Sequence, residues 1–135
     1  MFVEKIMSLN VHSVTPNTTL AELRKIFSEV HYHHLIVVED AKLVGVISDR
    51  DVLRMSSPYL DAAEVSEHDQ SLLVKPAKDF MATKLVVAEK DTLIDAAAIL
   101  LLENRISCLP IVSNGIYIEG ILTWKDMLKY YVYVR

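Results

Sequence analysis

Residues Gly45–Asp51 read GVISDRD, and a second version of this stretch, GILTWKD, follows 75 residues later at Gly120–Asp126. Both versions place a glycine before two aliphatic residues and a hydroxyl, and both then carry a base followed by an acid. A chain that repeats itself at a fixed spacing contains a duplicated supersecondary unit. The duplication therefore decides how the rest of this sequence is divided.

The similarity extends outward from this stretch. Equivalent positions of the two copies carry the same residue at Met7 and Met81, Leu20 and Leu93, Leu35 and Leu109, and Asp51 and Asp126. Two repeats, residues 1–55 and 74–135, account for most of the chain. Residues 56–73 between them are polar and acidic, which is typical of a linker or an inserted loop.

Each repeat contains the same series of local signals. Short helices are predicted over 3–7 and 75–81, followed by short strands over 12–14 and 85–88. Capping boxes at Thr19 with Glu22 and at Thr92 with Asp95 predict the start of the next helix. Two strands and a hairpin turn follow in each copy (LIVV and LVGVIS; LPIV and YIEGIL), and a last helix begins after Ser48 and after Thr123. Since so small a sheet cannot bury both faces alone, we expect an α/β fold in which the repeats pack sheet to sheet.

Composition limits the class of protein. The chain has 135 residues, of which 52% are hydrophobic and 24% are charged, as in globular proteins. The net charge of −4 disfavours nucleic acid as a partner, and the single cysteine, Cys108, excludes an internal disulfide and a cysteine-based zinc site. The longest apolar run, Ala96–Leu102, is far shorter than the roughly 20 residues of a membrane span. With no signal peptide visible at the start, we expect a cytoplasmic protein without membrane contact.

The tandem order helix–strand–helix–strand–strand–helix resembles the CBS-domain pair, or Bateman module. The resemblance rests on IMS and FMA near the starts of the repeats, on HHLIVV and SCLPIV, and on GVISDRD and GILTWKD. It implies a compact module with two clefts between its motifs, which in this family often bind AMP, ADP, ATP or S-adenosylmethionine. It also implies a homodimer and a regulated protein partner, whose identity the sequence does not give.

The repeated hydroxyl and acid have two explanations. Ser48 with Asp51, and Thr123 with Asp126, fit the start of a capped helix, which by itself is worth about 1 kcal/mol. The same groups can also bind a nucleotide, because a carboxylate accepts hydrogen bonds from the hydroxyls of a ribose. A base in the first turn of a helix, as at Arg50 or Lys125, is locally unfavourable, and a nearby phosphate would offset this.

The resemblance extends the site to the first strand of the opposite repeat and to the start of its second strand, which form the wall for adenine. The first predicted nucleotide cleft then consists of Ser48, Arg50, Asp51, Thr83, Lys84, Val86, Ile106, Ser107 and Pro110. The second consists of Thr123, Lys125, Asp126, Asn10, His12, Tyr32, His33 and His34. Because the family's proline is present at Pro110 but replaced by Ile36 in the first copy, we expect the two clefts to bind with unequal affinity.

Three smaller features leave alternatives open. His31, His33 and His34 suit a metal site, a contact with phosphate, or simple packing. Trp124 either stacks on a base or packs at the start of the last helix, and Cys108 reads as a small buried residue. There is no glycine-rich phosphate loop, so we expect neither an enzyme nor a catalytic cofactor or metal.

The stretch Ala96–Leu102 is apolar around the whole circumference of its expected helix, unlike the corresponding helix of the first copy. One face packs on its own sheet, and the opposite face needs another cover. We therefore expect a homodimer through the helices. The alternative to a nucleotide sensor is a dimerisation or scaffold module with no small-molecule ligand.

Overall fold

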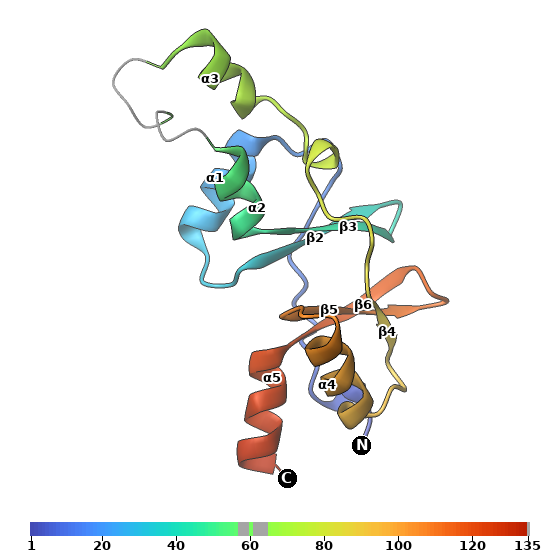
Figure 1. Ribbon diagram of the computed structural model, residues 1–135. Coiled ribbons are helices and arrows are strands. Elements are labelled where there is room, and N and C mark those ends of the chain that lie inside the picture. Colours follow the sequence, from blue (N-terminus) through green and yellow to red (C-terminus); the bar gives the residue numbers. More distant parts are fainter. Residues whose placement is uncertain (57–59, 61–64, 135) are drawn as a thin grey trace. The chain divides into compact units, whose positions relative to one another are not determined.

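A computed structural model of the chain describes residues 1–56, 60 and 65–134 (Figure 1). The predicted mixed α/β class is confirmed. The chain forms two compact units, each drawn from both sequence repeats. Unit one comprises Met1–His12, Asp40–Leu43 and Leu85–Arg135, and unit two comprises Ser13–Glu39 and Val44–Lys84.

The described residues of unit two form three short strands, three helices and one 3-10 turn. They are β1 (Ser13–Val14), α1 (Leu20–Glu29), β2 (His34–Glu39), most of β3 (Lys42–Ser48), α2 (Asp49–Met55), α3 (Glu67–Leu73) and the 3-10 helix η2 (Ala77–Asp79). β1 runs parallel to β2 and pairs Ser13 with Ile36. β2 and β3 are neighbours joined by a tight turn, in which Asp40 and Ala41 both have positive φ angles.

Unit one repeats this order. Its elements are the 3-10 helix η1 (Val3–Lys5), β4 (Ala88–Glu89), α4 (Ile94–Glu103), β5 (Cys108–Ser113), β6 (Tyr117–Thr123), α5 (Trp124–Lys129) and the π-helical turn η3 (Tyr130–Val134). β4 runs parallel to β5, and β5 and β6 form an antiparallel hairpin. The turn of this hairpin uses positive φ angles at Asn114 and Gly115, and Lys42 at the start of β3 pairs with Tyr117.

Several sequence expectations are corrected. The opening helices are single 3-10 turns, and the first short strands begin later than predicted, at Ser13 and Ala88. The capping box at Thr92 is wrong: α4 begins at Ile94 without a side-chain cap, and the carboxylate of Asp95 accepts a hydrogen bond from the Tyr131 hydroxyl instead. Asp95 therefore binds Tyr131, which is distant in the sequence, and does not form the cap that the local pattern predicts.

The predicted linker contains a helix that the sequence did not indicate. α3 begins after Ser66, whose hydroxyl accepts a hydrogen bond from the backbone N–H of Asp69. No residue of α3 is buried. The sequence of α3 therefore lacks the periodic apolar residues from which a helix is predicted. The remaining linker positions 57–59 and 61–64 lie outside the described residues. In the described part of the chain, no helix has the length and apolar character needed to cross a membrane.

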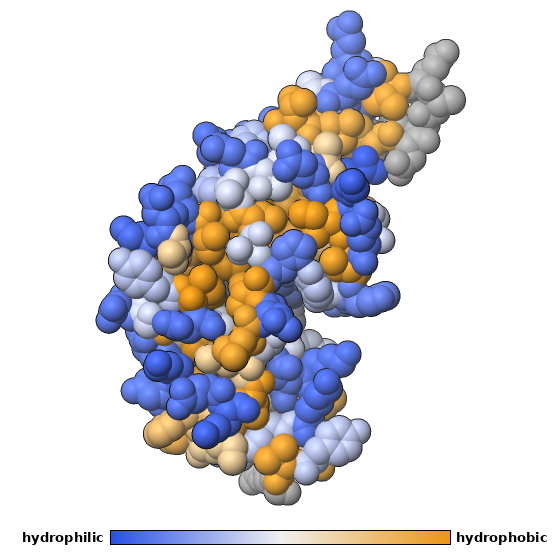
Figure 2. Space-filling model, turned by 180° about the vertical axis from the view of Figure 1, so that it is seen from behind, coloured by the Kyte–Doolittle hydropathy of each residue, from blue (hydrophilic) through white to orange (hydrophobic). Residues whose placement is uncertain are grey.

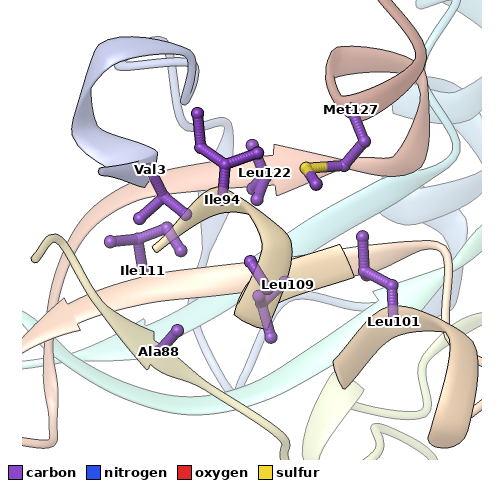
Figure 3. Close-up of a cluster of buried hydrophobic side chains, with 9 residues drawn as sticks. Val3, Ala88, Ile94, Leu101, Leu109, Ile111, Leu122 and Met127 are labelled. Atoms are coloured by element: carbon purple, nitrogen blue, oxygen red, sulfur yellow. The ribbon is translucent and has the colours of Figure 1, made fainter. Parts of the chain in front are cut away.

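Each unit has its own hydrophobic core. The core of unit one consists of Val3, Ala88, Ile94, Ala97, Leu101, Leu109, Ile111, Leu122 and Met127 (Figure 3). The core of unit two consists of Val14, Leu20, Leu23, Leu35, Val37, Ile47, Val52 and Ala77. Val3 and Ala77 are the informative members, because each is fully buried and each comes from the opening turn of the other repeat.

The opening segments of the two repeats are thus exchanged: η1 of the first repeat packs in unit one with most of the second repeat, and η2 of the second repeat packs in unit two with most of the first. Backbone hydrogen bonds hold these exchanged segments in place. In unit one, Ser8 and Ile121 exchange two N–H···O bonds of 2.8 and 2.9 Å. In unit two, Val46 and Ala82 do the same at 3.1 and 3.0 Å. Each opening segment is therefore bridged to the strand that leads into the repeated phrase of the opposite copy.

The glycine of the repeated phrase is explained by this close approach. A Cβ atom at Gly120 would lie 2.8 Å from Met7 Sδ and 2.9 Å from the carbonyl oxygen of Ser8. A Cβ atom at Gly45 would lie 2.5 Å from Met81 Sδ and 3.2 Å from the carbonyl oxygen of Ala82. Only a residue without a side chain admits the exchanged segment at these distances.

Alanine at either position is expected to destabilise the protein. Overpacking of this kind costs about 1–3 kcal/mol, and Gly120→Ala should cost more than Gly45→Ala because it meets a backbone oxygen at 2.9 Å. Urea unfolding of the variants measures the difference. Adding Met81→Ala should relieve part of the cost of Gly45→Ala, whereas adding Met7→Ala leaves Gly120→Ala in conflict with Ser8.

Gly115 provides the control, because it has a φ of +74° and open space around it. Asn tolerates that conformation, so Gly115→Asn should leave stability nearly unchanged. Equal effects of all three substitutions would contradict the proposed role of the exchanged segments.

Candidate functional site

The repeated phrase forms a complete capping box in both copies. In unit two, the Ser48 hydroxyl accepts the Asp51 N–H at 3.1 Å, and Asp51 Oδ2 accepts the Ser48 N–H at 2.9 Å. In unit one, the Thr123 hydroxyl accepts the Asp126 N–H at 3.3 Å, and Asp126 Oδ2 accepts the Thr123 N–H at 2.9 Å. The predicted capping is confirmed, so each phrase sets the start of a helix directly after a half-buried strand.

A second backbone contact holds the start of each helix against the start of a strand. The Asp49 N–H donates to the carbonyl of His33 at 2.9 Å, and the Trp124 N–H donates to the carbonyl of Ser107 at 3.1 Å. In unit two a side-chain pair is added, since His33 Nδ1 lies 2.7 Å from Asp49 Oδ2. The start of the helix and the start of the neighbouring strand thus meet at one edge in each unit.

The two edges differ in their histidines. Burial lowers the pKa of His34 below its usual 6.5, against the opposing charge of Asp49, which favours the neutral imidazole. Of the three alternatives for these histidines, metal binding finds no support, because the described residues contain no group of three or more His, Cys, Asp or Glu side chains suited to an ion.

The predicted site residues are divided between the units. Unit two contains Tyr32, His33, His34, Ser48, Arg50, Asp51, Thr83 and Lys84. Unit one contains Asn10, His12, Val86, Ile106, Ser107, Pro110, Thr123, Lys125 and Asp126. In each unit the exchanged segment ends next to the phrase: the bridge at Ala82 precedes Thr83, and the bridge at Ser8 precedes Asn10. Their assignment to a ligand stays a prediction.

The predicted site residues differ in how far their side chains are exposed to solvent, and the exposed ones are accessible to a ligand. Arg50, Lys125, Thr83 and Lys84 are exposed, and so is Asn10. Pro110, in contrast, is buried in β5, where it pairs with Ile121 of β6. Its predicted contact with a ligand stays a prediction.

A cavity next to Asp126 was not foreseen from the sequence. It has a volume of about 260 Å³ and is lined by Ile6, Asp126, Lys129, Tyr130, Tyr133 and Val134. All of these residues belong to unit one, and Ile6 comes from the exchanged opening segment. The available signal was the aromatic stretch YYVYV, which follows the capped acid by one helical turn.

Trp124 and Cys108, the remaining residues that the sequence singled out, differ in exposure. Trp124 is 59% exposed, so packing does not account for it and its ring is accessible for stacking. Cys108 is buried, as predicted. Burial, together with the nearby charge of Asp126, raises the pKa of its thiol to about 12.

The sequence matches the family model of the CBS domain over residues 3–57 and again over residues 77–133. The chain belongs to the CBS domain family. The CBS pair predicted from the repeated phrases is therefore confirmed, with both motifs present in tandem.

Curated relatives are larger than this chain. An uncharacterised protein of Methanocaldococcus jannaschii, MJ1232, is 33% identical over 119 residues, which are 88% of this chain and 36% of that protein. The inosine-5'-monophosphate dehydrogenase of Bifidobacterium longum is 32% identical over 119 residues, which are 87% of this chain and 20% of the dehydrogenase. The chain thus spans only a minor part of either relative.

Solved structures share the whole fold. CBSX2, whose structure contains AMP, is 29% identical with a TM-score of 0.80, over 97% of this chain and 96% of that one. The CBS domain pair of MJ0100, in complex with 5'-methylthioadenosine and S-adenosylmethionine, is 24% identical with a TM-score of 0.77, over 97% and 95% of the two chains. The structures of these two relatives thus contain adenosine-containing ligands, and at 24% identity the second supports the fold alone.

The thiol of Cys108 is expected to be unreactive in the folded protein. Thiolate is the reactive form, and a pKa of about 12 leaves almost none of it at pH 8. Ellman's reagent should therefore modify Cys108 only after unfolding in guanidinium chloride. Rapid modification in native buffer would show that β5 is more accessible than the structure indicates.

Proposed function

We propose that this protein is a non-catalytic, ligand-sensing regulatory module that binds an adenine nucleotide (AMP, ADP or ATP) through its paired CBS motifs. The observation that carries the proposal is the presence of two capped carboxylates, Asp51 and Asp126, each at the same point of the fold. The AMP-bound structure of a relative with 29% identity supports this ligand class.

The chemistry of the edge suits a ribose phosphate. Each carboxylate is half-buried and held by its cap, so it can accept ribose hydroxyls without losing side-chain freedom on binding. Arg50 and Lys125 follow the capping hydroxyl by two positions, are exposed, and supply one cation per copy for phosphate. This small complement of positive charge favours a ligand with one or two phosphates.

Sensing requires that the nucleotide bind one conformation or assembly better than another. Micromolar affinity, about −8 kcal/mol, would suit a metabolite sensor. We assign no catalytic step, because the sequence offers no phosphate loop and no nucleophile activated by a base. The regulated partner is a separate protein or region, and we place the module in the cytoplasm.

Ligand binding is expected to stabilise the fold. At 100 times the dissociation constant, a ligand adds about 2.7 kcal/mol to the free energy of unfolding. Thermal unfolding with AMP, ATP and S-adenosylmethionine should therefore show a raised Tm with at least one of them. The double variant Asp51→Asn/Asp126→Asn keeps the size of both side chains and should abolish the shift. No shift with any of the three would reject the nucleotide proposal.

A specific observation also favours self-association. Apolar side chains reach the surface in several places (Figure 2), and in unit one many of them lie along α4, α5 and η3. Those on these elements include Ile99, Leu102, Leu128, Val132 and Tyr133, with 52 to 81% of their surface exposed. The corresponding α1 exposes Glu22, Lys25 and Glu29 instead. We therefore propose a homodimer to which the helices of unit one contribute the apolar contact.

A charge on this helical face should weaken the dimer. Leu102 on α4 is 78% exposed, and Leu53 on α2 is 74% exposed, so the two leucines form a matched pair. We expect Leu102→Glu to shift the protein toward monomer in sedimentation velocity at micromolar concentration, whereas Leu53→Glu should not. A wild-type monomer over this range would contradict the proposal.

A further inference from the structure

The two repeated carboxylates differ in what engages them. Asp51 uses both oxygens: Oδ2 accepts the Ser48 N–H at 2.9 Å, and Oδ1 accepts Nη2 of Arg54 at 3.3 Å. The oxygens of Asp51 are therefore divided between the helix cap and a cation one turn further along α2. A ribose hydroxyl that approaches Asp51 therefore competes with the guanidinium for Oδ1.

Asp126 concentrates its contacts on one oxygen. Oδ2 accepts both the Thr123 N–H at 2.9 Å and the Thr123 hydroxyl at 3.1 Å. Within the described residues, Oδ1 receives no hydrogen bond and Asp126 has no ion pair. The carboxylate of the second copy thus keeps one oxygen available to a ligand.

The difference follows from one substitution between the repeats. Arg54 stands three residues after Asp51, and Lys129 stands three residues after Asp126. The planar guanidinium of Arg presents several N–H donors to a carboxylate, whereas the Lys ammonium is a strongly hydrated point charge on a flexible stem. Lys129 lines the cavity beside Asp126 without pairing with it.

We propose that Arg54 is a specificity-determining residue, which competes with the ribose for Asp51 and makes Asp126 the tighter nucleotide site. This inference rests on the proposed function. The cavity of about 260 Å³ beside Asp126 supports it independently, since it provides space next to the available carboxylate. A hollow of that volume has room for part of a nucleoside rather than for the whole ligand.

The size of the effect is limited by solvent. Arg54 is 74% exposed, and exposed ion pairs are worth at most about 1 kcal/mol, which corresponds to about fivefold in affinity. Arg54 therefore lowers the affinity of the Asp51 site for the nucleotide without abolishing binding there. Removal of the Arg54 side chain should tighten binding at Asp51.

Titration calorimetry with AMP on the full chain tests the proposal through reciprocal variants. In the wild type we expect a tighter and a weaker site. Asp126→Asn should remove the tighter site, and Asp51→Asn should remove the weaker one. Arg54→Ala should tighten the weaker site by up to about fivefold. Lys129→Arg, which transfers the competing group to the second copy, should weaken the tighter site by a similar factor.

Lys25→Ala is the control for net charge, because Lys25 is exposed on α1 of the same unit and lies outside the site. It should leave both affinities unchanged. Loss of the tighter site in Asp51→Asn, or weaker binding in Arg54→Ala, would overturn the role of Arg54 while leaving nucleotide binding intact. No heat with AMP in the wild type would instead reject the proposed function, and with it this inference.

Discussion

The close approach of each opening segment to the glycine of the opposite repeat is the constraint on which this structure depends. Met7 and Ser8 pass Gly120 at distances that leave no room for a side chain, and Met81 does the same at Gly45. The approach permits the backbone bridges that hold the segment in place. It also buries Val3 and Ala77 completely, so each core is completed by residues from the other repeat.

Mutual completion explains why the unit occurs twice. A single copy would lack the buried residue that closes its core and would expose an unbridged strand edge, both of which are unfavourable in water. Contacts of this kind connect residues distant in the chain, with 113 positions between Met7 and Gly120 and 36 between Gly45 and Met81, so each unit depends on both repeats. The packing of the fold therefore accounts for the repeated phrase even without a ligand.

The proposed ligand site uses the same phrase. Its glycine admits the neighbouring segment, its hydroxyl caps the helix, and its acid completes the cap with one oxygen. The two copies differ at the other carboxylate oxygen, Oδ1, which accepts a hydrogen bond from Arg54 in the first copy. A duplicated fold can thus acquire two unequal sites through a change outside the shared phrase, which is the basis of the inference about Arg54.

The sequence by itself determined the duplication, the α/β class, the hairpins and the caps at Ser48 and Thr123, because all of these depend on residues close together in the chain. Tertiary structure alone decided the exchange of η1 and η2, the cavity beside Asp126, and the pairing of Tyr131 with Asp95 that replaced the expected cap at Thr92. These contacts join residues distant in sequence, and local periodicity carries no information about which distant group will reach a given carboxylate or glycine.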